Sequence, residues 1–478
     1  MTTQDAGWSL PLVAPGVTPV LDPFFRPAAL AWRAFRQRAR DTGRPAHARF
    51  ALEQKDGSVS HLETELLPET DPGAAANLGM LERLVKLALW ARGGFRIHLD
   101  APAGLAERLA AHYRDSPTGR FDSEIVGERV HDHPLEVVAT AHLPSARATA
   151  ASLGGHLDGC RIGFDLGGSD RKVAAIIDGR VVWSEETEWD PYHQPDPQYH
   201  WDGIMDSLRK AAAHLPRVDA IGGSAAGVYV DNQVRFASLF RGVAPDLFER
   251  RVRNMFRDLR HAWHDVPFDV ANDGDVTALL GSLSLHDGAV LGIALGTSTA
   301  GGYVTADGSI APWLNEIAFV PVDYRPDAPR DEWSGDYGCT VQYLSQQAVG
   351  RLLAPARIAL GPGLPLPLKL KKVQALMLAG DPRAEDIYLT LGAYLGYATA
   401  HLASVYDFHH VLVLGRVTSG PGGEVMLETA REVLRLDFPE LAERIKFHMP
   451  GEIDKRHGQA IAAASLPARE APPAVLHA

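Results

Sequence analysis

The sequence predicts a multidomain α/β protein in which one supersecondary unit occurs twice. Its 478 residues suit about two to four domains rather than one. Residues 161–182 and 289–310 share one order of segments: an apolar strand, a turn of small residues, a second strand, an Asp-Gly turn and a third segment. Strands joined by Gly-Gly and Asp-Gly turns are typical of a β-meander. The repetition indicates two copies of one unit within the chain.

The composition argues against several classes of function. A net charge of −12 disfavours nucleic-acid binding, which needs a clustered basic surface. An anionic small ligand stays compatible, because a metal ion and backbone N–H groups can create a local positive site. No apolar stretch approaches a membrane span, and the first residues lack the pattern of a secretion signal. We therefore expect a cytoplasmic protein without nucleic-acid or membrane partners, whose Cys160 and Cys339 are packing residues.

Residues 1–157 are expected to form a small α/β module of their own, without a chemical motif. His131 and His133 flank Asp132 in a polar stretch, but no further metal ligand is evident, so we interpret them as solvated loop residues. Linker composition follows, rich in small residues and glycine. Strand and helix patterns occur at residues 49–66 (a hairpin about Asp56-Gly57), 81–92 (helix), 95–100 (strand) and 104–113 (helix).

The first turn in each copy of the repeated unit is suited to phosphate binding. Glycine lets the backbone approach a ligand closely, and successive N–H groups can form an anion-binding concavity. One Gly-Gly turn alone would be an ordinary hairpin turn, but its duplication favours two turns that hold a polyphosphate. The P-loop, the dinucleotide fingerprint and the nucleophile elbow are all absent from the sequence. The turn residues are Gly167, Gly168 and Ser169 in the first copy and Gly296, Thr297 and Ser298 in the second.

A pair of carboxylates follows an apolar strand between the two copies. The strand ends in Asn272-Asp273-Gly274-Asp275, and helical spacing begins there. Asp273 or Asp275 could be a helix N-cap. A carboxylate near phosphate-binding turns could instead accept the proton of a hydroxyl that attacks a phosphoryl group. The spacing alone leaves both interpretations open.

Six segments in this order resemble the ROK (repressor, open reading frame, kinase) sugar kinases of the actin-like ATPase superfamily. They are GFDLGGSDRKVAAIIDG, AIGGSAAGVYVDNQVRFASLF, ANDGDVTALLG, LGIALGTSTAGGYVTADGSI, HHVLVLGRVTSGPGG and HGQAIAAASL. The resemblance covers about residues 161–466. It implies two ribonuclease-H-like lobes around a cleft, at 158–284 and 285–466, after the amino-terminal module; residues 467–478 have the composition of a disordered tail.

The resemblance also implies an ATP-dependent kinase that phosphorylates a hydroxyl of a sugar, amino sugar, polyol or cyclitol. In this comparison Asp273 matches the general base and Asp165 the residue that helps hold Mg²⁺, directly or through water. Both turns would bind the phosphates of ATP, and Gly415 would lie beside the adenosine. Asn272 and Glu316 match positions that contact the sugar.

The sequence departs from the family at several positions. Phe319 stands where a zinc-binding histidine is common, and only Cys339 remains of a downstream cysteine cluster, so we expect no zinc. Val341 replaces a second sugar-contacting glutamate, and Ser238 replaces an asparagine. We therefore expect an altered acceptor pocket. In the second turn, Ser298 and Ala300 replace glycines, although a serine hydroxyl can still donate to phosphate.

The alternative function is a non-catalytic sensor or scaffold that binds sugar or nucleotide with a degenerate kinase fold. Retention of Asp165 and Asp273 favours an enzyme. Residues 189–201, WDPYHQPDPQYHW, could be a lid but are interpreted as a surface loop docked on the core. Residues 359–372 are interpreted as a connector. The acceptor and the oligomeric state, including a homodimer, are left open.

Overall fold

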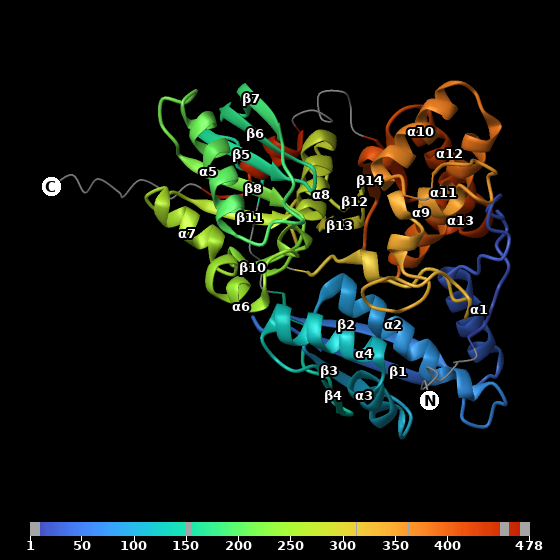
Figure 1. Cartoon of the computed structure of the whole chain (residues 1–478). Coiled ribbons are helices and arrows are strands. Elements are labelled where there is room, and N and C mark those ends of the chain that lie inside the picture. The colour runs from blue at the N-terminus through green and yellow to red at the C-terminus, as the bar shows by residue number, and fades with distance from the viewer. Residues whose placement is uncertain (1–9, 149–153, 312, 362, 450–457, 469–478) are drawn as a thin grey trace. The chain divides into compact units, whose positions relative to one another are not determined.

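The computed structural model describes residues 10–148, 154–311, 313–361, 363–449 and 458–468 (Figure 1). The chain forms two compact units. The first comprises Met1–Thr149, Ala294–Ala300 and Pro312–His448, and the second Ala150–Ile293, Gly301–Ala311 and Met449–Ala478. Among the described residues, no helix combines the length and apolarity needed to cross a membrane. Residues 469–478 of the predicted tail lie outside the described residues.

A five-stranded sheet of order β11-β8-β5-β6-β7 forms the centre of the second unit. The strands β5, β6 and β7 pair antiparallel in sequence order, which confirms the predicted meander, while β8 and β11 add parallel strands. The central strand β5 is almost wholly buried, as expected for a strand covered on both faces. The bounds are β5 Cys160–Leu166, β6 Asp170–Ile177, β7 Arg180–Glu188, β8 Ala220–Ala225 and β11 Phe268–Asn272.

Helices α5 (Gln198–Ala212), α7 (Met255–Ala262), α8 (Asp273–Leu285) and α14 (Gln459–Ala464) belong to the same unit. Helix α14, near the red end of the chain in Figure 1, packs on β5 and β8. A Cβ atom on Gly163 or Gly222 would lie 1.8 Å from the carbonyl oxygen of Ala460 or Ala463, respectively. Only glycine permits this close approach, which brings the start of α14 to the strand ends.

The second copy of the repeated unit forms β12 (Val290–Leu295) and β13 (Thr299–Val304) in a sheet of order β13-β12-β14-β15. Its third segment contributes only an isolated bridge between Val304 and Ile310. Strands β14 (His410–Leu414) and β15 (Lys446–His448) complete the sheet. In the first unit, helices α11 (Pro382–Leu402) and α12 (Pro421–Asp437) pack against each other.

The amino-terminal residues form a sheet of order β2-β1-β3-β4 with helices α1, α2 and α3. The predicted hairpin, both predicted helices and the predicted strand are all present. The bounds are β1 Ala46–Glu53, β2 Val59–Leu66, β3 Arg96–Asp100, β4 Glu136–Ala139, α1 Ala28–Asp41, α2 Asn77–Arg92 and α3 Leu105–Asp115.

Two local interpretations were wrong. Residues 359–372 are not only a connector, because helix α10 (Leu366–Leu378) begins within them; Pro367 occupies its first turn, where proline is tolerated. His131 is buried rather than solvated, and the ring of His133 stacks on Phe95 with centroids 4.5 Å apart. Both cysteines are buried and free, as predicted.

Candidate active site

Asp165 lies near the carboxyl end of β5, where its partners across the sheet are Lys172 on β6 and Ser224 on β8. The Ser224 hydroxyl donates to Oδ1 of Asp165 at 2.7 Å. Burial raises the pKa of Asp165, and Lys172 and the Ser224 hydroxyl offset this only in part. Lys172 contacts Asp170 at 3.4 Å and is one-third exposed, so it belongs to this charged group.

Asp273 is the first residue of α8 and is partly buried. Burial first, and the charge of Asp165 second, raise the pKa of Asp273 to about 7. The helix N-cap is neither of the carboxylates but Asn272, whose Oδ1 accepts from the Gly274 N–H at 2.7 Å. The carboxylate of Asp273 is therefore not required as the N-cap. A carboxyl group with a pKa near neutrality is suited to general acid–base chemistry.

Asn272, the predicted sugar contact, is held by its own surroundings. Its Nδ2 donates to the Gly227 carbonyl at 2.6 Å, while Oδ1 caps the helix. Both interactions fix the side chain next to Asp273. Its contact with an acceptor stays a prediction.

Gln459, the first residue of α14, joins the two carboxylate-bearing segments. Its Nε2 donates to the carbonyl of Asp273 at 2.7 Å and to the Ser224 hydroxyl at 3.2 Å. Gln459 therefore links β8 to the start of α8. The pattern of its segment, HGQAIAAASL, does not reveal this role, because the partners of Gln459 lie 186 and 235 residues away.

The turn Gly167–Ser169 connects β5 and β6. The Gly167 N–H donates to the Asp170 carbonyl at 2.9 Å, and the Trp189 indole donates to the Gly167 carbonyl at 2.7 Å. A Cβ atom on Gly168 would come within 2.0 Å of the Tyr192 hydroxyl. Glycine at this position therefore allows Tyr192 to lie directly against the turn.

Tyr192 comes from the aromatic segment 189–201, which was interpreted as a docked surface loop. Trp189 is indeed docked, with its indole in the core of this unit. Tyr192, however, hydrogen-bonds with Ser238 and lies close enough to Asp273 for that carboxylate to raise its pKa. The guanidinium of Arg241 stacks over the Tyr192 ring at 4.2 Å from the centroid. The aromatic segment thus reaches the candidate base, which its spacing did not reveal.

The second turn lies in the other unit. The Gly296 N–H donates to the Ser298 carbonyl, and the Gln346 N–H donates to the Gly296 carbonyl, both at 2.9 Å. Gly415 follows β14 with φ 109°, and a Cβ atom there would lie 2.4 Å from the carbonyl oxygen of Leu295. The structure therefore brings Gly415 next to the start of this turn, at the ends of neighbouring strands.

Glu316 belongs to the same unit as the second turn and is partly buried at the start of a short 3-10 helix, η5 (Ile317–Phe319). The preceding residue, Asn315, has a left-handed backbone with φ 54°. Asp165, Asn272, Asp273 and the first turn belong to the other unit.

Among the described residues, no group of three or more His, Cys, Asp or Glu side chains could hold a metal ion by itself. Mg²⁺ does not require such a cage, because it commonly uses one or two carboxylates together with substrate phosphates. The Asp165 carboxylate, next to a turn of backbone N–H groups, fits that donor set. At the zinc-motif positions, Phe319 packs on Trp90 with ring centroids 4.3 Å apart, and Cys339 is fully buried.

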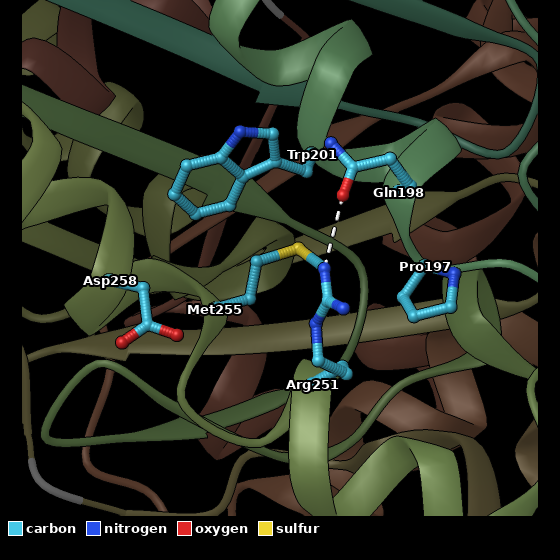
Figure 2. Close-up of a pocket in the computed structure, with 6 residues that line it drawn as sticks. All are labelled: Pro197, Gln198, Trp201, Arg251, Met255 and Asp258. Atoms are coloured by element: carbon cyan, nitrogen blue, oxygen red, sulfur yellow. Dashed lines mark hydrogen bonds between the residues drawn. The ribbon is translucent and has the colours of Figure 1, made fainter.

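A separate small pocket of about 190 Å³ lies elsewhere in the second unit (Figure 2). Within it, Arg251 donates to the Gln198 side-chain oxygen at 3.0 Å. None of the predicted site residues lines it. Its lining residues are Pro197, Gln198, Trp201, Arg251, Met255 and Asp258.

Comparison with known proteins places this geometry in context. No family model matches the sequence. The curated glucokinase of Streptomyces coelicolor is 27% identical over 297 residues, which are 57% of this chain and 86% of that protein. The solved ROK family glucokinase from Streptomyces griseus, in complex with glucose and AMPPNP, is similar with a TM-score of 0.52 and 23% identity over 65% of this chain and 99% of that chain.

A ROK family transcriptional regulator, a homologue of the E. coli MLC protein, is also similar, with a TM-score of 0.52 and 19% identity over 65% of this chain and 78% of that chain. The chain thus has the two-lobed α/β fold of these ROK proteins over about 65% of its length. The predicted resemblance to ROK sugar kinases is confirmed.

Proposed function

We propose that the protein is an ATP-dependent carbohydrate kinase that phosphorylates a hydroxyl of a sugar, amino sugar, polyol or cyclitol. The observation that carries the proposal is Asp273, a carboxyl group with a pKa of about 7 beside a second carboxylate, Asp165. A base with this pKa is half ionised near neutral pH and can take up a proton during turnover. The likeness to a curated glucokinase supports the same chemistry.

In the proposed reaction, the ionised Asp273 accepts the proton of the acceptor hydroxyl while that oxygen bonds to the terminal phosphorus of ATP. As this bond forms, the bond between the terminal phosphorus and the oxygen of ADP breaks, and ADP leaves with the electron pair of that bond. Backbone N–H groups of the turns Gly167–Ser169 and Gly296–Ser298 bind phosphate oxygens, and Gly415 lies beside the adenosine. Mg²⁺, held with help from Asp165, neutralises phosphate charge when bound.

The acceptor side of the proposal uses Asn272 and Glu316 as sugar contacts. Ser238 and Val341, which replace common family residues, change the polar groups available to the acceptor. We therefore propose an acceptor specificity different from that of the glucokinases. A cytoplasmic location and a homodimer stay predictions.

The proposal is tested by measuring ADP release from MgATP with a panel of hexoses, amino sugars, pentoses, polyols and inositols. Asp273→Asn should abolish acceptor-dependent turnover. Asp269→Asn is the matched control, because Asp269 is also a partly buried aspartate with a raised pKa and lies on β11, four residues before Asp273. Activity retained in Asp273→Asn would show that Asp273 is not the base.

The alternative is a non-catalytic sensor with the same fold, and the likeness to a transcriptional regulator keeps it in view. It predicts that calorimetry detects a sugar or nucleotide ligand while no acceptor on the panel releases ADP. ADP release that requires an acceptor and Asp273 would exclude this alternative.

A further inference from the structure

Helix α2 of the amino-terminal module is buried along nearly its whole length, from Asn77 to Ala91. The buried residues include Glu82, Arg83 and Lys86, each at most 2% exposed. A helix on the surface of an independent module would keep its charged face in water. Buried charges are costly unless they are paired, so the partners of these side chains show what the helix packs against.

The partner is a loop about 250 residues later in the chain. Arg83 donates to both carboxylate oxygens of Asp336, at 2.7 and 3.2 Å, and the Lys86 ammonium lies 2.9 Å from the same carboxylate. Burial would raise the pKa of Asp336, but the two cations outweigh it and hold that pKa far below its usual value. Lys86 also contacts Asp122 of the module at 3.0 Å. Helix α2 and the loop around Asp336 therefore form one buried ionic cluster.

The end of α2 holds the segment that precedes Glu316. The last carbonyl groups of a helix lack partners within the helix, and here they accept from the loop: Asn315 N–H donates to the Ala91 carbonyl at 2.9 Å and Leu314 N–H to the Arg92 carbonyl at 3.4 Å. The Tyr406 hydroxyl bridges this junction, 3.2 Å from the Ala91 carbonyl and 3.0 Å from Oδ1 of Asn315.

Further contacts hold both sides of the segment. The Arg92 guanidinium stacks over the Trp313 ring at 4.9 Å and donates to the Val405 carbonyl at 3.1 Å. On the other side of Glu316, Phe319 packs on Trp90. Asparagine adopts the left-handed backbone of Asn315 more readily than other non-glycine residues, and the contacts from α2 hold the segment on both sides of this residue.

We propose that the amino-terminal module is a positioning element for the acceptor site: α2 fixes residues 313–319 and, through them, the direction of Glu316. This inference rests on the proposed function, in which Glu316 contacts the acceptor. The module then affects acceptor binding without contacting the acceptor, and leaves nucleotide binding unchanged.

Arg92→Met and Tyr406→Phe test the proposal in the full chain. Arg92 is only partly buried and Tyr406→Phe removes one oxygen, so both changes should leave the fold intact. The matched control is Arg96→Met, since Arg96 belongs to the same module but pairs with Glu53 and Glu136 near the surface. Each variant is examined by hydrogen exchange of residues 313–319 and by the KM for acceptor and for ATP.

Both test variants should exchange faster at residues 313–319 and raise the acceptor KM about five- to thirty-fold, as expected for one or two lost hydrogen bonds. The KM for ATP should not change. Exchange and acceptor KM equal to those of Arg96→Met would overturn the inference. If the unaltered protein has no kinase activity, the proposed function fails, and the exchange at residues 313–319 still decides whether α2 positions the segment.

A separate observation carries a second inference, on Tyr192. Its hydroxyl lies against Gly168 of the first turn, hydrogen-bonds with Ser238 and lies near Asp273. The structure assigns Tyr192 as a catalytic residue whose hydroxyl donates a hydrogen bond to an oxygen of the phosphoryl group during transfer. This inference also rests on the proposed function. A donor aimed at developing charge accelerates the chemical step more than it strengthens substrate binding.

Tyr192→Phe should lower kcat about 10- to 100-fold, with little change in either KM and unaltered ATP affinity by calorimetry. The matched control is Tyr199→Phe, because the Tyr199 hydroxyl accepts from the Asp190 N–H instead. A Tyr192→Phe enzyme with the kcat of Tyr199→Phe would overturn the assignment. Absence of turnover in the unaltered protein would count against the proposed function. In that case, a higher ATP affinity in Tyr192→Phe than in the unaltered protein would show that Tyr192 blocks the nucleotide site.

Discussion

Asp273→Asn should stabilise the protein at alkaline pH while it abolishes catalysis. Burial and the charge of Asp165 raise the pKa of Asp273 from 3.8 to about 7, a change of about three units. At roughly 1.36 kcal/mol per unit, ionisation of this group destabilises the folded protein by about 4 kcal/mol. The neutral asparagine removes that cost and can still accept the Gly274 N–H that the carboxylate accepts at 3.1 Å.

The size of the stabilisation increases with pH. The folded protein keeps the Asp273 proton up to about pH 7, whereas the unfolded chain releases it near pH 3.8. Stability of the unaltered protein therefore falls as pH rises from about 4 to 7, and the full cost is present above that. At pH 5 the cost is about 2 kcal/mol and at pH 8 about 4 kcal/mol, so the advantage of the variant should grow by about 2–3 kcal/mol over this interval.

The measurement is urea unfolding of both proteins at pH 5 and pH 8, without ligands. Asp246→Asn, on the exposed start of α6 (Pro245–Leu247), controls for the loss of one surface charge. The same pKa predicts that kcat/KM of the unaltered enzyme rises with pH to a plateau above about pH 7, because only the ionised carboxylate accepts a proton. An advantage of Asp273→Asn that is equal at the two pH values would refute the reasoning.

Two further predictions concern groups around the carboxylates. In the folded protein the Ser224 hydroxyl donates to Asp165 and lowers the pKa of that carboxyl, so Ser224→Ala should raise this pKa. The Mg²⁺ concentration for half-maximal activity should therefore rise more at pH 6 than at pH 8. Equal rises at the two pH values in a metal titration would contradict the role of this hydrogen bond. Gly222→Ala places a methyl group 1.8 Å from the Ala463 carbonyl and should lower the unfolding free energy by about 1–3 kcal/mol, measured by urea unfolding. Gly361→Ala, which meets no atom within 4 Å, should be near neutral.

The parts of the fold that the sequence predicted depend on local patterns. Alternating strands and paired glycines defined the meander of β5 to β7, and the change from strand to helical spacing located Asp273 at the start of α8. The hairpin about Asp56-Gly57 was equally local, since Gly57 supplies the positive φ of its turn. The missed helix α10 shows the converse, because its early proline is a common sign of a loop.

The site was only partly predictable because several of its contacts join distant segments. Gln459 contacts residues 186 and 235 positions earlier, and Tyr192 reaches Asp273 from a segment whose aromatic spacing has no fixed meaning. A pKa near 7 is also a property of three-dimensional surroundings. An aspartate in the sequence becomes a candidate base only after burial and a second carboxylate have changed its proton affinity.

Helix α2 depends on a distant segment for the burial of its charged residues. Its sequence, LERLVKLALWAR, has helical spacing, and charged residues within such a pattern ordinarily face water. Glu82, Arg83 and Lys86 are nevertheless buried. Asp336, in a loop about 250 residues away, supplies the countercharge for Arg83 and Lys86, and Glu82 pairs with Arg83 at 2.8 Å. Removing one partner from a buried ion pair costs far more than removing one from the surface. The loop around Asp336 and helix α2 therefore depend on each other for stability.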